Sequence, residues 1–182
     1  VIAGLIKDGR YSYPYLPDGV YADLRTASNL RFQIQSELTR IQNRISRWFS
    51  IYFPEYKDVY GNPDAKSGIM ILKQAPLPED IVTLGVEGIN RIWREAKLKA
   101  VGLKRAKTLY EAAEHSIGSR EGATAARLEI RMLLEDYESR AARLQEIMTL
   151  IESLVKQIPM ADKLMEIKGV GIKTVSGFLA EV

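Results

Sequence analysis

The residues best suited to bind a ligand form a glycine turn near the end of the chain, at Lys168, Gly169, Gly171, Lys173 and Thr174. Two glycines two positions apart allow positive φ and remove side-chain bulk, so the N–H groups that begin the following helix can lie open to an anion. The lysines add positive charge at that helix start. The pattern predicts a helix-hairpin-helix, which holds a nucleic-acid backbone without reading its sequence. The alternative is an ordinary helix end, although such an end requires only one glycine.

A second candidate for phosphate binding is a basic segment in the middle of the chain. Between Arg91 and Tyr110 the sequence has seven basic residues and one acid, whereas the whole chain has a net charge of only +3. A local excess of this kind attracts phosphates, and a solvated helix face beside an acidic partner would look the same. The residues that we expect to contact nucleic acid here are Arg94, Lys97, Lys99, Lys104, Arg105 and Lys107.

Residues with catalytic chemistry are sparse. The only histidine is His115, the chain has no cysteine, and the glycines match neither a phosphate-binding P-loop nor a dinucleotide fingerprint. We therefore expect no catalytic residue, no metal site and no cofactor in this chain. The absence of cysteine suits a reducing cytoplasm, and no apolar run has the length of a membrane span. We expect a cytoplasmic protein that makes no membrane contact.

Two long stretches have apolar residues at alternating steps of three and four, which is the spacing of a coiled-coil seam. The first runs from Leu24 to Tyr52 and is interrupted in polarity only by Arg31, and the second runs from Ile130 to Ile158. Such narrow stripes favour packing against another helix, either each other or the same stripe of a second copy. The expected seam residues are Leu38, Ile41, Ile45, Trp48, Leu134, Ala141, Leu144, Met148, Ile151 and Val155.

These elements predict an all-α, elongated chain in three parts. Residues 1–20 comprise a short amphipathic helix and an extended linker rich in proline and tyrosine. Residues 21–158 form the coiled-coil region, with a small helical head inserted at about residues 54–118 in which a helix starts within residues 76–80. Residues 159–182 form the helix-hairpin-helix, whose anchors to a core would be Ile167, Val170 and Ile172.

The order of several short segments is similar to that of a known family. The segments are VIAGLIKDGRY at residues 1–11, YADLR at 21–25, RIQNRI at 40–45, FPE at 53–55, AAEHSIG at 112–118, and the run from IKGVG at 167–171 to residue 181. Together they resemble the central part of the DEDD-class insertion-sequence transposases, which are guided by a bridge RNA. The resemblance covers nearly the whole chain.

The resemblance implies a role within a larger recombinase. In that family an RNase H-like domain with Mg²⁺-binding acids comes first, a coiled coil follows, and a later domain supplies a nucleophilic serine. The acids would precede residue 1 and the serine would follow residue 182, so Ser176 is not that nucleophile. The implied partners are DNA, a guide RNA and further copies of the chain. Two alternatives remain: a pure oligomerisation scaffold, and a DNA-repair protein of the helix-hairpin-helix kind.

Overall fold

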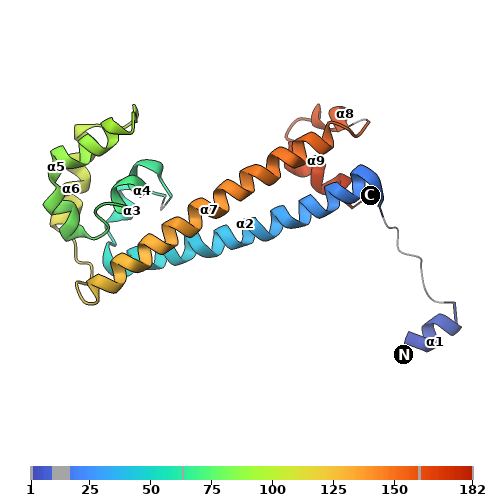
Figure 1. The fold of residues 1–182 in the computed structure, drawn as a ribbon, viewed down its shortest axis with the longest axis horizontal. Coiled ribbons are helices and arrows are strands. Elements are labelled where there is room, and N and C mark those ends of the chain that lie inside the picture. Colours follow the sequence, from blue (N-terminus) through green and yellow to red (C-terminus); the bar gives the residue numbers. More distant parts are fainter. Residues whose placement is uncertain (1, 10–16, 63, 160, 182) are drawn as a thin grey trace. The chain divides into compact units, whose positions relative to one another are not determined.

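The computed structural model describes residues 2–9, 17–62, 64–159 and 161–181 (Figure 1). These residues form helices and turns and contain no strand, which confirms the all-α prediction. The elongated outline stays a prediction. The helices are α1 (Ile2–Lys7), α2 (Gly19–Tyr52), α3 (Tyr56–Tyr60), α4 (Lys66–Leu72), α5 (Pro78–Glu95), α6 (Leu103–Glu114), α7 (Ala123–Val155), α8 (Ala161–Met165) and α9 (Ile172–Leu179).

The chain divides into two compact units. The central unit is Ile34–Arg143, and the terminal unit combines Val1–Gln33 with Leu144–Val182. Both long helices, α2 and α7, have residues in each unit. The sequence-based boundaries at residues 20 and 158 follow the parts of the family resemblance, and they stay a prediction.

In the central unit, α2 and α7 pack side by side in opposite directions (Figure 1). The indole Nε1 of Trp48 donates to the carbonyl oxygen of Ala126 over 3.0 Å, and further along Arg140 Nε lies 2.5 Å from Glu37 Oε2. The expected seam residues of both helices are buried at this contact: Leu38, Ile41, Ile45, Trp48 and Leu134. In this unit the two seams therefore pair within one chain.

The buried stripe of α7 is wider than the predicted seam. Leu133, which lies outside the three-four spacing, is buried, whereas the seam residue Ala141 is only half-buried. The seam prediction was too narrow because α7 also packs against the inserted helices. Leu133 belongs to the same core as Ile81 and Ile89 of α5.

The segment predicted to form the inserted head contains the helices α3 to α6. Proline at the first turn and Asp80, whose carboxylate accepts from the Leu77 N–H over 3.1 Å, start α5. Arg127 of α7 donates to the same carboxylate over 2.8 Å, which ties α7 to that helix start. Inside the head, Trp93 Nε1 donates to the Ser67 carbonyl over 2.8 Å. Side-chain donors thus position α5 against both α4 and α7.

The terminal unit contains the glycine turn. Val175 and Ala180 are buried, and Ser176 has no exposed surface. The predicted helix at the start of the chain is present as α1, and no residue of α1 is buried. The tyrosine-rich part of the predicted linker, residues 10–16, lies outside the described residues. No helix among the described residues is long and apolar enough to cross a membrane.

Candidate nucleic-acid interface

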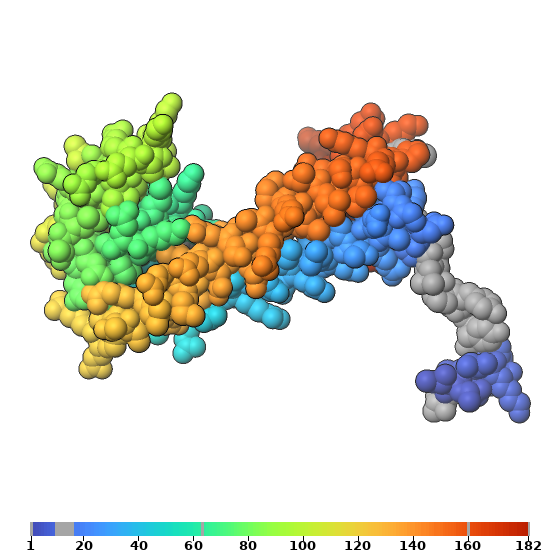
Figure 2. Space-filling model, viewed as in Figure 1, coloured from blue at the N-terminus to red at the C-terminus, as the bar shows by residue number. Residues whose placement is uncertain are grey.

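The basic segment folds into the end of α5, the start of α6 and the turn that joins them. We call this surface the basic turn and define it by Arg94, Lys97, Lys99, Lys104 and Lys107, all of which are exposed. The yellow-green loop between α5 and α6 projects from the rest of the central unit in Figure 2. Five of the six predicted contacts therefore lie exposed on this turn and on the helix ends that flank it.

The backbone at the start of this turn takes an uncommon conformation. Lys97 has a φ of 56°, and it is the only residue other than glycine with positive φ among the described residues. The Lys97 N–H donates to the Arg94 carbonyl and the Leu98 N–H to the Trp93 carbonyl, both over 3.0 Å. These two bonds form a Schellman motif, in which the residue at the Lys97 position is usually glycine. A lysine there holds its charge on a rigid helix end.

The cations of the basic turn differ in whether they have partners. Lys107 lies 3.8 Å from a carboxylate oxygen of Glu111, one helical turn along α6. Within the described residues, Arg94, Lys97, Lys99 and Lys104 form no ion pair. Unpaired charges on a protruding turn remain free to meet an anion.

Arg105, the sixth predicted contact, points toward α3. Its guanidinium donates to the Val59 carbonyl and lies 5.6 Å from the ring centroid of Tyr60. Burial raises the pKa of Tyr60 to about 12, so this ring stays neutral beside the cation at physiological pH. Arg105 therefore has a structural role in fastening α6 to α3, and we leave it out of the basic turn.

The predicted helix, glycine turn and second helix are present in the terminal unit as α8, the turn at residues 166–171, and α9. Gly169 has a φ of 88°, where a side chain would be strained, but Gly171 has a φ of −112°, which any residue adopts. Only one of the two glycines is therefore needed for the backbone conformation. A Cβ on Gly171 would meet no atom within 4 Å, so neither the backbone conformation nor the packing requires glycine at this position.

The amides of this turn are open. Among the described residues, the N–H groups of Gly171, Ile172 and Lys173 donate to no backbone carbonyl, as expected at a helix N-terminus. Lys168 and Thr174 are exposed beside them. The hydrophobic anchors are less complete than predicted. Val170 and Ile172 are half-buried, but Ile167 is 55% exposed and anchors nothing.

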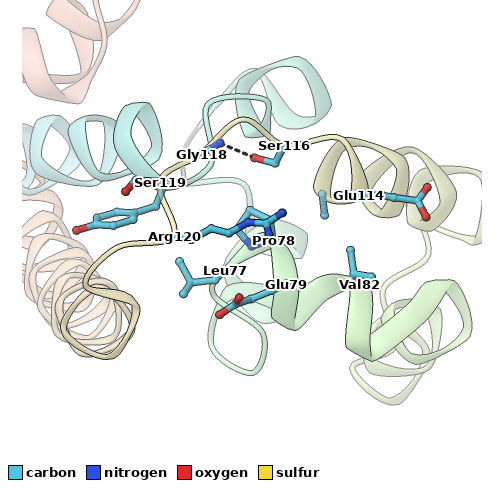
Figure 3. Close-up of a pocket in the computed structure, with 11 residues that line it drawn as sticks. Leu77, Pro78, Glu79, Val82, Glu114, Ser116, Gly118, Ser119 and Arg120 are labelled. Carbon is cyan, nitrogen blue, oxygen red and sulfur yellow. Dashed lines mark hydrogen bonds between the residues drawn. The ribbon is translucent and has the colours of Figure 1, made fainter.

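The central unit also has a small pocket of about 240 Å³, shown in Figure 3. Its wall includes the segment after α6, which is held by one carboxylate. Glu55 accepts a hydrogen bond from Ser116 Oγ over 2.6 Å and another from the Ile117 N–H over 2.9 Å. The Gly118 N–H in turn donates to Ser116 Oγ over 3.2 Å, the bond drawn in Figure 3. These bonds fix the path of the chain between α6 and α7.

The side chains beside this pocket have structural roles and form no catalytic pair. His115 Nδ1 lies 2.9 Å from the Glu111 carbonyl oxygen, so the ring is not hydrogen-bonded to the adjacent Ser116, as a nucleophile and its base would be. Partial burial raises the pKa of Glu55. The hydrogen bonds from Ser116 and Ile117 together lower the pKa by more than burial raises it, so the net pKa is below its ordinary value. Glu55 is thereby kept as an anion that clamps the loop.

The described residues include no group of three acidic or histidine side chains that could hold a metal ion.

One basic surface was missed from the sequence: Arg40, Arg44 and Arg47 line the exposed side of α2. Their spacing of four and three residues, on a flank of the helix beside the seam, was the available signal. Comparison of the chain with models of protein families and with curated proteins finds no match.

Proposed function

We propose that this chain is the central segment of a DEDD-class insertion-sequence transposase and that it holds nucleic acid by the phosphate backbone. The family part of the proposal rests on the order of the short segments described above. The binding part rests on the basic turn and on the glycine turn between α8 and α9. Strand cleavage, with its Mg²⁺-binding acids and its serine, is assigned to other domains of the parent protein.

The observation that carries the binding part is the left-handed conformation of Lys97. This conformation costs about 1–2 kcal/mol for a residue with a Cβ, and glycine would avoid that cost. Strained residues tend to occur at functional sites, where the surrounding structure holds them in place. At the Lys97 position the strained residue is also a cation, and three further exposed cations that form no ion pair, Arg94, Lys99 and Lys104, lie close to it in sequence. A binding function explains why a lysine is found where the fold favours glycine.

The glycine turn supplies a second contact of the same kind. Open amides at the start of α9 suit a phosphate oxygen, and Lys168 and Lys173 add charge. Contacts to phosphate fix the register of a nucleic acid but carry no sequence information. We therefore expect the segment to bind DNA and RNA of unrelated sequence with affinities that fall steeply with salt.

Assembly of a multimer would not use the seams of the central unit. They are buried within one chain in the central unit, so a second copy would have to use another surface. Large exposed side chains in the terminal unit are better placed for that role, and a cluster of such side chains often marks an interaction site. The large hydrophobic residues that are exposed on its parts of the long helices and on α9 are Leu30, Phe32, Leu150 and Phe178.

The test of binding is the substitution Lys97→Gly in the whole chain. Glycine keeps the Schellman turn and removes the charge, so folding and binding are separated. We expect fluorescence anisotropy with a labelled 25-base-pair duplex of arbitrary sequence to show weaker binding, with a salt slope flattened by about 0.9 units for the one lost phosphate contact. Thermal unfolding should show equal or greater stability.

The control is Lys57→Gln, because Lys57 is an exposed lysine of the same unit outside the basic turn. It should leave the slope unchanged. Equal slopes for the parent chain, Lys97→Gly and Lys57→Gln would remove the basic turn from the interface. A parent chain that binds neither DNA nor RNA in 50 mM salt would overturn the proposed binding as a whole.

A further inference from the structure

The arginines of α2 form a row on one face of the central unit. Arg40, Arg44 and Arg47 are four and three residues apart, which places them on the same side of a helix. All three are exposed, whereas Ile41, Ile45 and Trp48 on the seam side are buried. We call Arg40, Arg44 and Arg47 the arginine row.

The charges of the arginine row are not neutralised by acids. From residue 38 to the end of α2 there is no acidic residue, and Glu37 just before it lies 2.5 Å from Arg140 of α7. Within the described residues the row forms no ion pair. Arg127 and Arg140 of α7, in contrast, each contact a carboxylate. These two arginines are thus paired with acids, whereas those of the row are not.

The length of the row matches a phosphate backbone. Arg40 and Arg47 are separated by about 10.5 Å along the axis at the helical rise of 1.5 Å per residue. One strand of duplex DNA places a charge about every 3.4 Å along its axis, so about three phosphates face that length. Guanidinium groups bind phosphate through two parallel N–H bonds, which favours arginine over lysine for this contact.

A membrane surface fits the row less well. Helices that lie in a membrane interface insert an apolar face beside their basic face. The apolar face of α2 in the central unit is already buried against the core, and Asn43 and Ser36 lie near the arginines on the exposed side. The surface that remains has one large apolar side chain, Ile51, which is 43% exposed one turn beyond Arg47, and is otherwise polar and cationic. A single exposed apolar residue is too little for insertion into a membrane, so this surface suits a solvated polyanion better.

We propose that the arginine row is a separate contact to the sugar-phosphate backbone of a nucleic acid, beyond the basic turn and the glycine turn. This inference rests on the proposed nucleic-acid binding of the chain and extends it to α2. The row binds about three consecutive phosphates of one strand, from either DNA or RNA, and it contributes affinity without sequence preference.

The test compares two triple variants of the whole chain that lose the same charge. Arg40→Gln, Arg44→Gln and Arg47→Gln together remove the row. The control combines Arg120→Gln, Arg131→Gln and Arg143→Gln, three exposed arginines of the same unit that also form no ion pair among the described residues and do not share one helix face. Circular dichroism should show the same helicity and melting for both variants and the parent.

Binding is measured by anisotropy against salt with a 25-base-pair duplex and with an RNA hairpin, both of arbitrary sequence, and with polyglutamate as a non-nucleic polyanion. Removing the row should flatten the salt slope for duplex DNA by about 2.7 units, or 0.9 for each of three phosphates, while the control changes it much less. A flatter salt slope with the duplex, the hairpin or both supports the inference and identifies the nucleic acid that the row binds.

Three results would overturn the inference. If both triple variants lose the same slope, the effect is one of net charge and not of the row. If polyglutamate binding falls as much as DNA binding, the row is a general anion surface. If removal of the row changes nothing while Lys97→Gly still weakens binding, the row fails and the proposed function stands. A parent chain that binds neither nucleic acid overturns both.

Discussion

The central and terminal units share two long helices, yet they differ in their ion pairs. Among the described residues every ion pair lies in the central unit, including those of Arg127 and Arg140. Both units bury polar atoms without a hydrogen-bond partner: Ser28 Oγ and Arg31 Nε in the terminal unit, and Tyr56 Oη, Tyr60 Oη and Asn90 Oδ1 in the central unit. A buried polar atom without a partner costs about 1–3 kcal/mol.

The two units also differ in their exposed apolar side chains. The terminal unit is the smaller of the two, but most of the large hydrophobic side chains exposed among the described residues belong to it. They are Ile2, Leu5, Ile6, Leu30, Phe32, Leu150, Ile167 and Phe178. The terminal unit therefore has more exposed apolar side chains for its size than the central unit and none of the ion pairs found among the described residues.

The largest expected effect follows from truncating the core of the central unit. Trp48 is 1% exposed and joins α2 to α7 through its indole N–H, so Trp48→Ala should lower the free energy of unfolding by about 3–5 kcal/mol. Urea denaturation followed by circular dichroism measures this loss. Ile51→Ala, an exposed position on the same helix, should cost well under half as much. Similar losses for the two variants would contradict a core centred on Trp48.

A smaller loss is expected from adding one methyl group at Gly118. A Cβ there would lie 2.1 Å from the backbone oxygen of Tyr52, so the loop would have to move away from α2. Gly118→Ala should destabilise the central unit by about 2 kcal/mol, within the usual range for overpacking. Gly177→Ala is the control, because a Cβ there meets no atom within 4 Å. Thermal melts that rank the two variants in the opposite order would disprove this close approach.

In the terminal unit, one substitution should increase stability. Arg31→Met removes a buried guanidinium whose Nε has no partner and loses its cation–π contact with Phe32, 4.2 Å from the ring centroid. The net gain should be about 1 kcal/mol, because the relieved desolvation cost exceeds a cation–π contact of about 0.5–1 kcal/mol. Hydrogen exchange should slow in the terminal unit alone. A destabilised variant would mean that Arg31 is satisfied by an interaction that the structure lacks.

The smallest effect depends on pH and concerns the clamp on the loop after α6. The folded-state pKa of Glu55 lies below its ordinary value of 4.5, so the clamp stabilises the fold above that value and is lost as the pH falls through the folded pKa. Glu55→Gln should therefore lower the melting temperature by a few degrees at pH 7 and by less at pH 3. A difference that stays constant between these pH values would mean that the charge of Glu55 is irrelevant.

Much of the helical fold could be predicted from local patterns. Alternating steps of three and four residues predicted α2 and α7, and proline with acids at residues 76–80 predicted the start of α5. The glycines at 169 and 171 predicted the turn between α8 and α9, although only Gly169 takes a positive φ. These signals are readable because helix periodicity and helix ends depend on neighbouring residues.

The candidate site was predicted less completely. The density of lysine and arginine near residue 100 located the basic turn, but not that Lys97 adopts a left-handed conformation or that Arg105 turns toward Val59. The spacing of the arginine row could be read from the sequence, but which arginines of the unit form ion pairs with acids could not. Ion pairs between distant segments, such as that of Arg140 with Glu37, depend on packing.

By itself, therefore, the sequence determined that the chain is helical, where its long helices and glycine turn lie, and where its positive charge is concentrated. Only the tertiary structure decided that the two seams pair within one chain in the central unit and that α7 buries a wider stripe including Leu133. It also decided that, among the described residues, four cations of the basic turn and the three of the arginine row form no ion pair. The physical reason is that periodicity specifies which face of a helix is apolar, whereas the identity of the partner that covers it is set by contacts between residues far apart in the chain.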